Sequence, residues 1–145
     1  MIAEKKKPLF VCVENSNRSQ MAQAFANIHG GVQVEAYSAG SRPSGLVNPK
    51  AIEAMRELGY DLAQHASISL DELPGDDFDF VATMGCGDVC PHVVAKKRAD
   101  WQIPDPRDMN PAEFRQVRDL IEQYVRQALR ELDAELLTHD NPIKK

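Results

Sequence analysis

The chain has 145 residues, of which 43% are hydrophobic and 27% are charged. These values exclude a disordered or fibrous protein and favour one globular domain over residues 1–145. The net charge of −5 argues against a general nucleic-acid-binding protein, but a local positive pocket for a small anion is compatible with it. The apolar run near the N-terminus, residues 8–13, is too short for a signal-peptide core or a membrane span. We therefore expect a cytoplasmic protein without membrane contact.

Strands and helices alternate along the predicted chain. The predicted strands are short runs that are continuously apolar or alternate apolar and polar residues: 8–13, 32–38, 78–84 and 101–103. The predicted helices have an apolar face or clear start and stop signals: 19–30, 48–58, 67–73 and 110–136. Asn48-Pro49 and Asn110-Pro111 each combine a capping residue with proline at the first helical position. This alternation predicts an α/β fold, with a parallel sheet flanked by helices on both faces.

The loop after the first strand has the composition of an anion site. Backbone N–H groups at a strand-to-helix turn, here Val13, Glu14, Asn15, Ser16 and Asn17, point at a bound anion, and the helix dipole adds positive potential. The same field favours the thiolate form of a cysteine at the end of the strand. Because the loop has no glycine, Asn15 is expected to take up a left-handed backbone conformation. A purely structural cysteine beside a surface arginine is the alternative.

Three side chains around this loop carry its predicted chemistry. Cys12 ends the strand, Arg18 suits bidentate contact with a tetrahedral oxyanion, and the Ser19 hydroxyl can donate to a thiolate. The chain has no Gly-x-x-x-x-Gly-Lys pattern, which excludes a nucleotide-binding phosphate loop. In parallel sheets, ligands bind at the carboxyl ends of strands. We therefore expect Cys12, the segment 86–90 and Asp105, which each follow a predicted strand, to converge at one edge.

This pattern, Cys-x5-Arg-Ser directly after the first strand, resembles the low-molecular-weight protein tyrosine phosphatases and the arsenate reductases that share their fold. The resemblance includes residues 37–40, 59–67 and Asp105-Pro106. It implies a four-stranded parallel sheet flanked by helices. It also implies that Cys12 is the nucleophile, Arg18 the oxyanion ligand, Ser19 the support for the thiolate and Asp105 the general acid.

Glu14 departs from the family pattern, because relatives often have glycine or a neutral residue there. A carboxylate beside an anion site would be repulsive, so we expect it to point outward into solvent. Asp105 lies between two prolines, a rigid placement for a general acid, although an ordinary turn aspartate is the alternative. The four histidines show no triad-like arrangement with the cysteine and are expected to be structural or surface residues.

The two remaining cysteines, Cys86 and Cys90, separate the branches of the family. The chain has three cysteines, an odd number that disfavours permanent disulfides in a reducing compartment. A phosphatase needs one cysteine, whereas a reductase must also deliver two electrons, for which a thiol relay is the direct route. On one helical turn, the Cα atoms of Cys86 and Cys90 would lie about 6 Å apart, within the range for a disulfide. A passive pair and a zinc site of Cys86, Cys90, His92 and Cys12 are the alternatives.

The resemblance thus predicts a monomeric arsenate reductase with no metal or organic cofactor. Cys12 would attack arsenate, Cys86 would displace arsenite, and Cys90 would leave a disulfide for thioredoxin or another thiol reductant. Phosphate and sulfate would compete as oxyanions. The alternative enzyme is a tyrosine phosphatase of the same fold, and the sequence Arg107-Asp108-Met109 weakens it because such phosphatases tend to carry tyrosines after the aspartate. A non-enzymatic oxyanion-sensing module is the third hypothesis.

Overall fold

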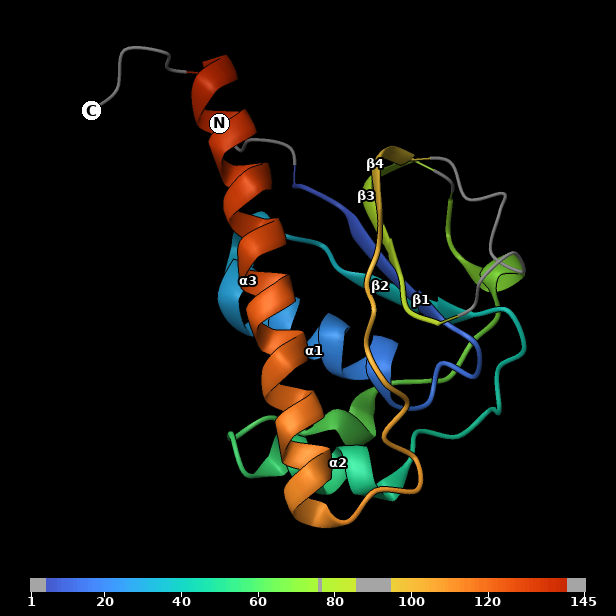
Figure 1. The fold of residues 1–145 in the computed structure, drawn as a ribbon. Coiled ribbons are helices and arrows are strands. Elements are labelled where there is room, and N and C mark those ends of the chain that lie inside the picture. Colours follow the sequence, from blue (N-terminus) through green and yellow to red (C-terminus); the bar gives the residue numbers. More distant parts are fainter. Residues whose placement is uncertain (1–4, 76, 86–94, 141–145) are drawn as a thin grey trace.

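The computed structural model describes residues 5–75, 77–85 and 95–140, with the side chains of 133–140 outside the description. One parallel sheet has the strand order β2-β1-β3-β4 (Figure 1). The strands are β1 (Pro8–Cys12), β2 (Tyr37–Gly40), β3 (Phe78–Thr83) and β4 (Ala95–Asp100). The α-helices are α1 (Arg18–Gly30), α2 (Pro49–Arg56) and α3 (Pro111–Asp140). The predicted α/β class with a four-stranded parallel sheet is confirmed.

The two faces of the sheet are covered differently. Apolar side chains of α1, α2 and α3 form one core with Phe10 and Phe80 of the sheet. On the other face, Leu9 and Val11 pack beneath the connection between α2 and β3, which contributes Ile68, Leu70 and Leu73. Because successive residues of a strand point to opposite faces, the apolar run of β1 supplies both cores. Strand β1 is therefore buried along its whole length, which fixes the position of Cys12 at its end.

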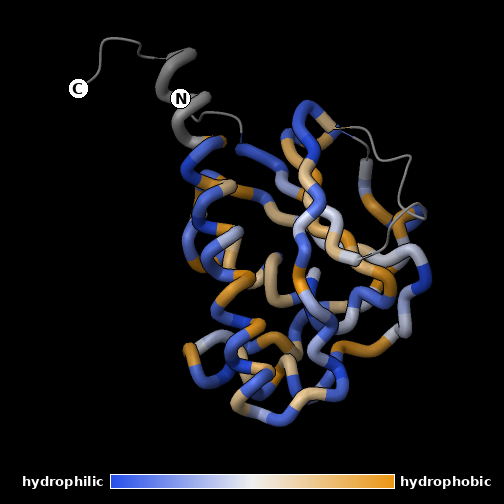
Figure 2. Tube along the Cα trace, in the orientation of Figure 1, coloured by the Kyte–Doolittle hydropathy of each residue, from blue (hydrophilic) through white to orange (hydrophobic). Residues whose placement is uncertain are grey.

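The apolar stripe predicted for the last helix is confirmed. Polar and apolar residues alternate along α3 in Figure 2, as expected of a helix that packs on one side only. Its buried apolar side chains are Phe114, Val117, Ile121, Val125, Ala128 and Leu132. Among the described residues, no helix combines the length and the apolar character that crossing a bilayer requires.

The predicted second strand, 32–38, is wrong in its bounds. Gly31 has a φ of +57°, and residues 31–33 form a 3-10 turn after α1. Val34 makes only an isolated bridge before β2 begins. Val32 is 84% exposed, so this valine belongs to the turn and not to the face of a strand, whereas Val34 packs against the core.

The predicted last strand, 101–103, is also wrong, because β4 is the charged segment before it. An edge strand pairs through its backbone on one side only, and its charged side chains face solvent, which removes the apolar pattern. Trp101 and Ile103 are buried, as their apolar character suggests, but they follow the strand. The carboxyl end of β4 therefore leads directly into the segment that contains Asp105.

The short helix predicted over 67–73 is shorter than expected. A 3-10 helix spans Leu70–Glu72 and is capped by Ser69, whose side chain accepts from the Asp71 N–H, while Glu72 completes a capping box. Another 3-10 helix, Leu62–Gln64, was not predicted from the sequence.

Candidate active site

A cavity of about 460 Å³ opens at the carboxyl ends of the strands. Cys12, at the end of β1, is 3% exposed and lies at its lining. The loop 13–17 connects β1 to α1, which begins at Arg18. Asn15 has a φ of +50°, which confirms the left-handed conformation expected for this residue. The lining side chains and loop residues are Cys12, Val13, Glu14, Ser16, Asn17, Arg18, Arg42, Gly85, Asp105 and Arg107.

The carbonyl groups of the loop turn away from the cavity. They accept hydrogen bonds from surrounding segments: Val13 from Arg42 N, Glu14 from Ser44 N, Asn15 from Gln20 Nε2, Ser16 from Asn48 N and Asn17 from Met21 N. In a planar trans peptide the N–H points opposite to the carbonyl. The N–H groups of residues 14–18 are thereby left on the cavity side, which is the arrangement that an oxyanion requires.

Gly40 allows the loop to lie close to β2. A Cβ atom at this position would lie 2.6 Å from the Val13 carbonyl oxygen and 3.0 Å from the Asn15 nitrogen. Gly40 also pairs with Cys12 in the sheet register. Any larger residue would push the backbone of the anion loop outward.

The hydrogen bonds around Asn15 fix the direction in which Ser19 donates. The Ile68 N–H donates to Asn15 Oδ1 at 2.9 Å. Because a backbone N–H can only donate, the other amide atom, Asn15 Nδ2, faces Ser19 Oγ at 2.7 Å. Ser19 Oγ therefore accepts from Asn15, and its own hydrogen is available to Cys12 Sγ at 2.9 Å. This contact has the geometry predicted for a hydroxyl that supports a thiolate.

Gln20 extends this network behind the loop. Its Nε2 donates to Asn15 Oδ1 and to the Ala66 carbonyl, both at 3.0 Å, which leaves its Oε1 to accept from His65 Nδ1 at 2.9 Å. The Tyr60 hydroxyl lies 2.7 Å from His65 Nε2 and donates to it in this tautomer. Burial lowers the pKa of His65, in agreement with a neutral ring. His65 therefore has a structural role: it bonds to Gln20 and Tyr60 behind the anion loop.

Arg18 joins the three strand ends. It is 8% exposed, and its Nη1 donates to the Ile103 carbonyl at 2.9 Å. Its Nη2 lies 3.8 Å from Asp105 Oδ2, which is an ion pair but too long for a hydrogen bond. Gly85 packs directly against the guanidinium, since a Cβ there would lie 2.5 Å from Arg18 Nη1. Arg18 therefore lines the same cavity as Asp105 and Cys12.

Asp105 is held at the mouth of the cavity by its own turn. The Arg107 N–H donates to Asp105 Oδ1 at 3.1 Å, while the side chain of Asp105 remains 45% exposed. Cys12, Arg18 and Asp105 thus line one cavity, and the buried Ser19 contacts the Cys12 sulfur. Cys86 and Cys90 lie outside the described residues, and so does His92. The described chain reaches Gly85 at the lining of the cavity.

The side chain of Glu14 is exposed, as expected, but its carboxylate has a partner in the protein. Its carboxylate pairs with Arg107, with Oε2 3.0 Å from Nη1, and the side chain is 42% exposed. Arg107 and Arg42 also line the site, and neither was predicted from the sequence. The position of Arg107, two residues after the predicted general acid Asp105, is a signal that could have identified it. Nothing in the sequence marks Arg42 as a lining residue.

The charges around the cavity favour an anion. Among the described residues, Arg18, Arg42 and Arg107 line it together with two acids, Glu14 and Asp105, so the balance of these charges is positive in a chain with a net charge of −5. Within the described ranges, no group of three or more metal-ligating side chains occurs. Most ligands of the hypothetical zinc site lie outside these ranges, so that alternative is not tested.

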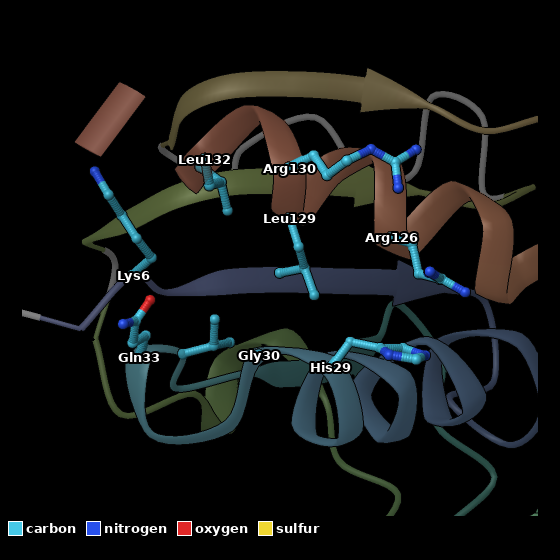
Figure 3. A pocket seen from close by; sticks show the side chains of 9 residues that line it. Lys6, His29, Gly30, Gln33, Arg126, Leu129, Arg130 and Leu132 are labelled. Carbon is cyan, nitrogen blue, oxygen red and sulfur yellow. The ribbon is translucent and has the colours of Figure 1, made fainter. Parts of the chain in front are cut away.

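A second cavity, of about 360 Å³, lies at the opposite end of β1 (Figure 3). Lys6, which precedes β1, and His29 of α1 line it together with Arg126 and Arg130 of α3. His29 Nε2 pairs with Glu122 at 2.7 Å. Of the predicted catalytic side chains that the structure describes, none lines this cavity, and it lies at the amino ends of the strands, away from the edge where parallel sheets hold their ligands.

Comparison with known proteins identifies relatives along most of the chain. The sequence model for low molecular weight phosphotyrosine protein phosphatase matches residues 7–138. Arsenate reductase 2 of Staphylococcus saprophyticus is 39% identical over 128 residues, which cover 86% of this chain and 96% of the relative. A solved structure of an arsenate reductase in the phosphate binding state superposes with a TM-score of 0.80 at 36% identity, covering 87% of this chain and 98% of that chain. A thioredoxin-dependent arsenate reductase of Corynebacterium glutamicum gives a TM-score of 0.76 at 30% identity and covers 93% of this chain and 65% of that one.

Proposed function

Because the chain belongs to the low-molecular-weight phosphotyrosine protein phosphatase family, we propose that it binds a tetrahedral oxyanion above Cys12 and, specifically, that it reduces arsenate to arsenite. The observation that carries the proposal is the loop 13–17: its carbonyls all accept hydrogen bonds from other groups of the chain, and most of its residues line one cavity together with Cys12 and Arg18. Relatives named arsenate reductase at 39% identity support the choice of arsenate.

The first step is the attack of the Cys12 thiolate on arsenic. A sulfur–arsenic bond forms and one arsenate oxygen leaves as water, for which Asp105 supplies a proton. The Ser19 hydroxyl stabilises the thiolate before attack through its 2.9 Å contact with Sγ. Arg18 and the loop N–H groups hold the remaining oxygens and the charge that they carry.

The next steps move two electrons from thiols to arsenic. Cys86 attacks the Cys12 sulfur, the sulfur–arsenic electron pair stays on arsenic, and arsenite leaves as a Cys12–Cys86 disulfide forms. Cys90 then attacks Cys86, which frees the Cys12 thiolate and leaves a Cys86–Cys90 disulfide. An external dithiol such as thioredoxin reduces that disulfide, and the cycle needs no metal or organic cofactor. We place the reaction in the cytoplasm, in a monomer that forms one domain.

The test follows arsenate-dependent NADPH oxidation in the presence of thioredoxin and thioredoxin reductase. The wild-type chain is expected to turn over, and Cys12→Ser, Cys86→Ser and Cys90→Ser are each expected to abolish turnover. Peptide mapping after one turnover without thioredoxin should find the Cys86–Cys90 disulfide in the wild-type chain.

Hydrolysis of p-nitrophenyl phosphate separates the rival functions, because it needs Cys12 but neither of the other two thiols. Brisk hydrolysis by the wild-type chain and by Cys86→Ser and Cys90→Ser, without arsenate turnover, would identify a phosphatase and reject the reductase. Tight phosphate binding without turnover of either substrate would identify an oxyanion-binding module instead.

A further inference from the structure

Glu14 places a negative charge in a loop that otherwise suits an anion. Its backbone is fixed, because its carbonyl accepts from the Ser44 N–H and from Ser67 Oγ, both at 3.0 Å. Only its side chain can adjust, and its carboxylate pairs with Arg107, another residue that lines the cavity, at 3.0 Å. The carboxylate is therefore paired with a cation that comes from a different segment of the chain.

Arg107 contacts both the anion loop and the acid. Its guanidinium pairs with Glu14, and its N–H donates to Asp105 Oδ1 at 3.1 Å. Its carbonyl accepts from Lys50 Nζ at 2.9 Å. The position of Asp105 relative to the loop thus depends on one residue that is attached at three points.

We propose that the ion pair between Glu14 and Arg107 is a latch that positions the general acid Asp105 over Cys12. The proposal rests on the oxyanion chemistry proposed above. In this arrangement Glu14 and Arg107 are positioning residues, since they act on the reaction through Asp105. The guanidinium also offsets the repulsion between Glu14 and a bound oxyanion, because its positive charge lies 3.0 Å from the Glu14 carboxylate.

The latch predicts that the two single variants lower kcat alike but change KM in opposite directions. Glu14→Gln removes the tether and also removes a negative charge from the loop. Its kcat for arsenate is therefore expected to fall about two- to fivefold, the scale of an exposed ion pair, while its KM falls as well. Arg107→Gln also lowers kcat but raises KM, because a positive charge is lost. If the pair had a merely structural role, Glu14→Gln would not lower both kcat and KM while Arg107→Gln lowers kcat and raises KM.

The reversed pair, Glu14→Arg with Arg107→Glu, restores the tether with opposite polarity. Its kcat is expected to exceed that of either reversed single variant, because each single change places two like charges side by side. The matched control is the ion pair between Glu53 and Arg56 on α2, whose side chains are 63% and 65% exposed. Glu53→Gln and Arg56→Gln should leave kcat and KM unchanged.

Deuterium exchange tests the latch without any turnover. Peptides that cover residues 104–110 should exchange faster in Glu14→Gln and Arg107→Gln than in the wild-type chain, and at the wild-type rate in the Arg56→Gln control. If the wild-type chain shows no arsenate turnover but this exchange pattern appears, the proposed function fails and the latch stands. Unchanged exchange in Glu14→Gln, or a Glu14→Gln variant with wild-type kcat in an active enzyme, would overturn the latch.

Discussion

Changing Asn15 to aspartate tests the direction of the hydrogen bonds that end on the Cys12 sulfur. Aspartate has the shape of asparagine, tolerates the left-handed backbone at φ +50°, and keeps an oxygen for the Ile68 N–H. What changes is the atom that faces Ser19 Oγ at 2.7 Å: a donor becomes an acceptor. The Ser19 hydrogen is then drawn to the new carboxylate and is lost to Cys12.

The size of the effect follows from the contact that is lost. A hydrogen bond to a charged group contributes about 1.5–3 kcal/mol. At about 1.4 kcal/mol for each factor of ten, the rate at which Cys12 is alkylated should fall by about tenfold to a hundredfold. Ser19→Ala removes the same donor without adding a charge, so the loss of Cys12 reactivity in this variant should lie within the same range.

The assay is alkylation of Cys12 by iodoacetamide at neutral pH, in a Cys86→Ser, Cys90→Ser background that leaves one cysteine. Protection by phosphate shows that the label reports the site. Both Asn15→Asp and Ser19→Ala should be alkylated more slowly than the parent. A Ser19→Ala variant that reacts at the parental rate would refute the donor direction, and a slow Asn15→Asp variant would then reflect charge alone.

Three further changes test other contacts of the site and fold. Gly85→Ala should weaken phosphate binding about tenfold in calorimetry, because the added Cβ would lie 2.5 Å from Arg18 Nη1. The control is Gly45→Ala, at a similar φ of +82° but with open space around it. It should lower the free energy of unfolding by about 1 kcal/mol and leave phosphate affinity unchanged. Burial lowers the pKa of His65, so as pH falls below about 6.5 the unfolded chain takes up a proton that the folded chain does not. The urea-unfolding free energy should therefore fall with pH there, and His65→Gln should lose that part of the dependence. Arg118 is 7% exposed and donates to a carbonyl of α2 at 2.9 Å, so Arg118→Gln should lower the unfolding free energy in urea by about 1–3 kcal/mol.

The parts of the fold predicted correctly are those that local sequence specifies. The apolar run of β1 is buried on both faces, so its pattern needs no knowledge of its neighbours. Asn48 caps α2 by accepting from the Lys50 N–H, as its sequence position indicates. The loop between Cys12 and Arg18 was predicted for the same reason, because its chemistry lies within seven consecutive residues.

The wrong or missing predictions concern parts of the structure that depend on pairing between distant residues. The charged segment of β4 is a strand because β3 offers it backbone partners, and its own residues carry no strand pattern. The contact between Glu14 and Arg107 joins residues 93 positions apart. Such a pair cannot be identified from one sequence, because its two members are ordinary charged residues at separate places.

Arg18 explains why the chemistry of separate segments meets at one point. It begins α1, directly after the loop that starts at Cys12, and donates to the Ile103 carbonyl beyond β4. On its other side it packs against Gly85, the residue that precedes Cys86 in the chain. One guanidinium is therefore in contact with the segments after β1, β3 and β4. A displacement of Arg18 would alter oxyanion binding, the approach of Asp105 and the start of the segment that carries the second thiol at the same time.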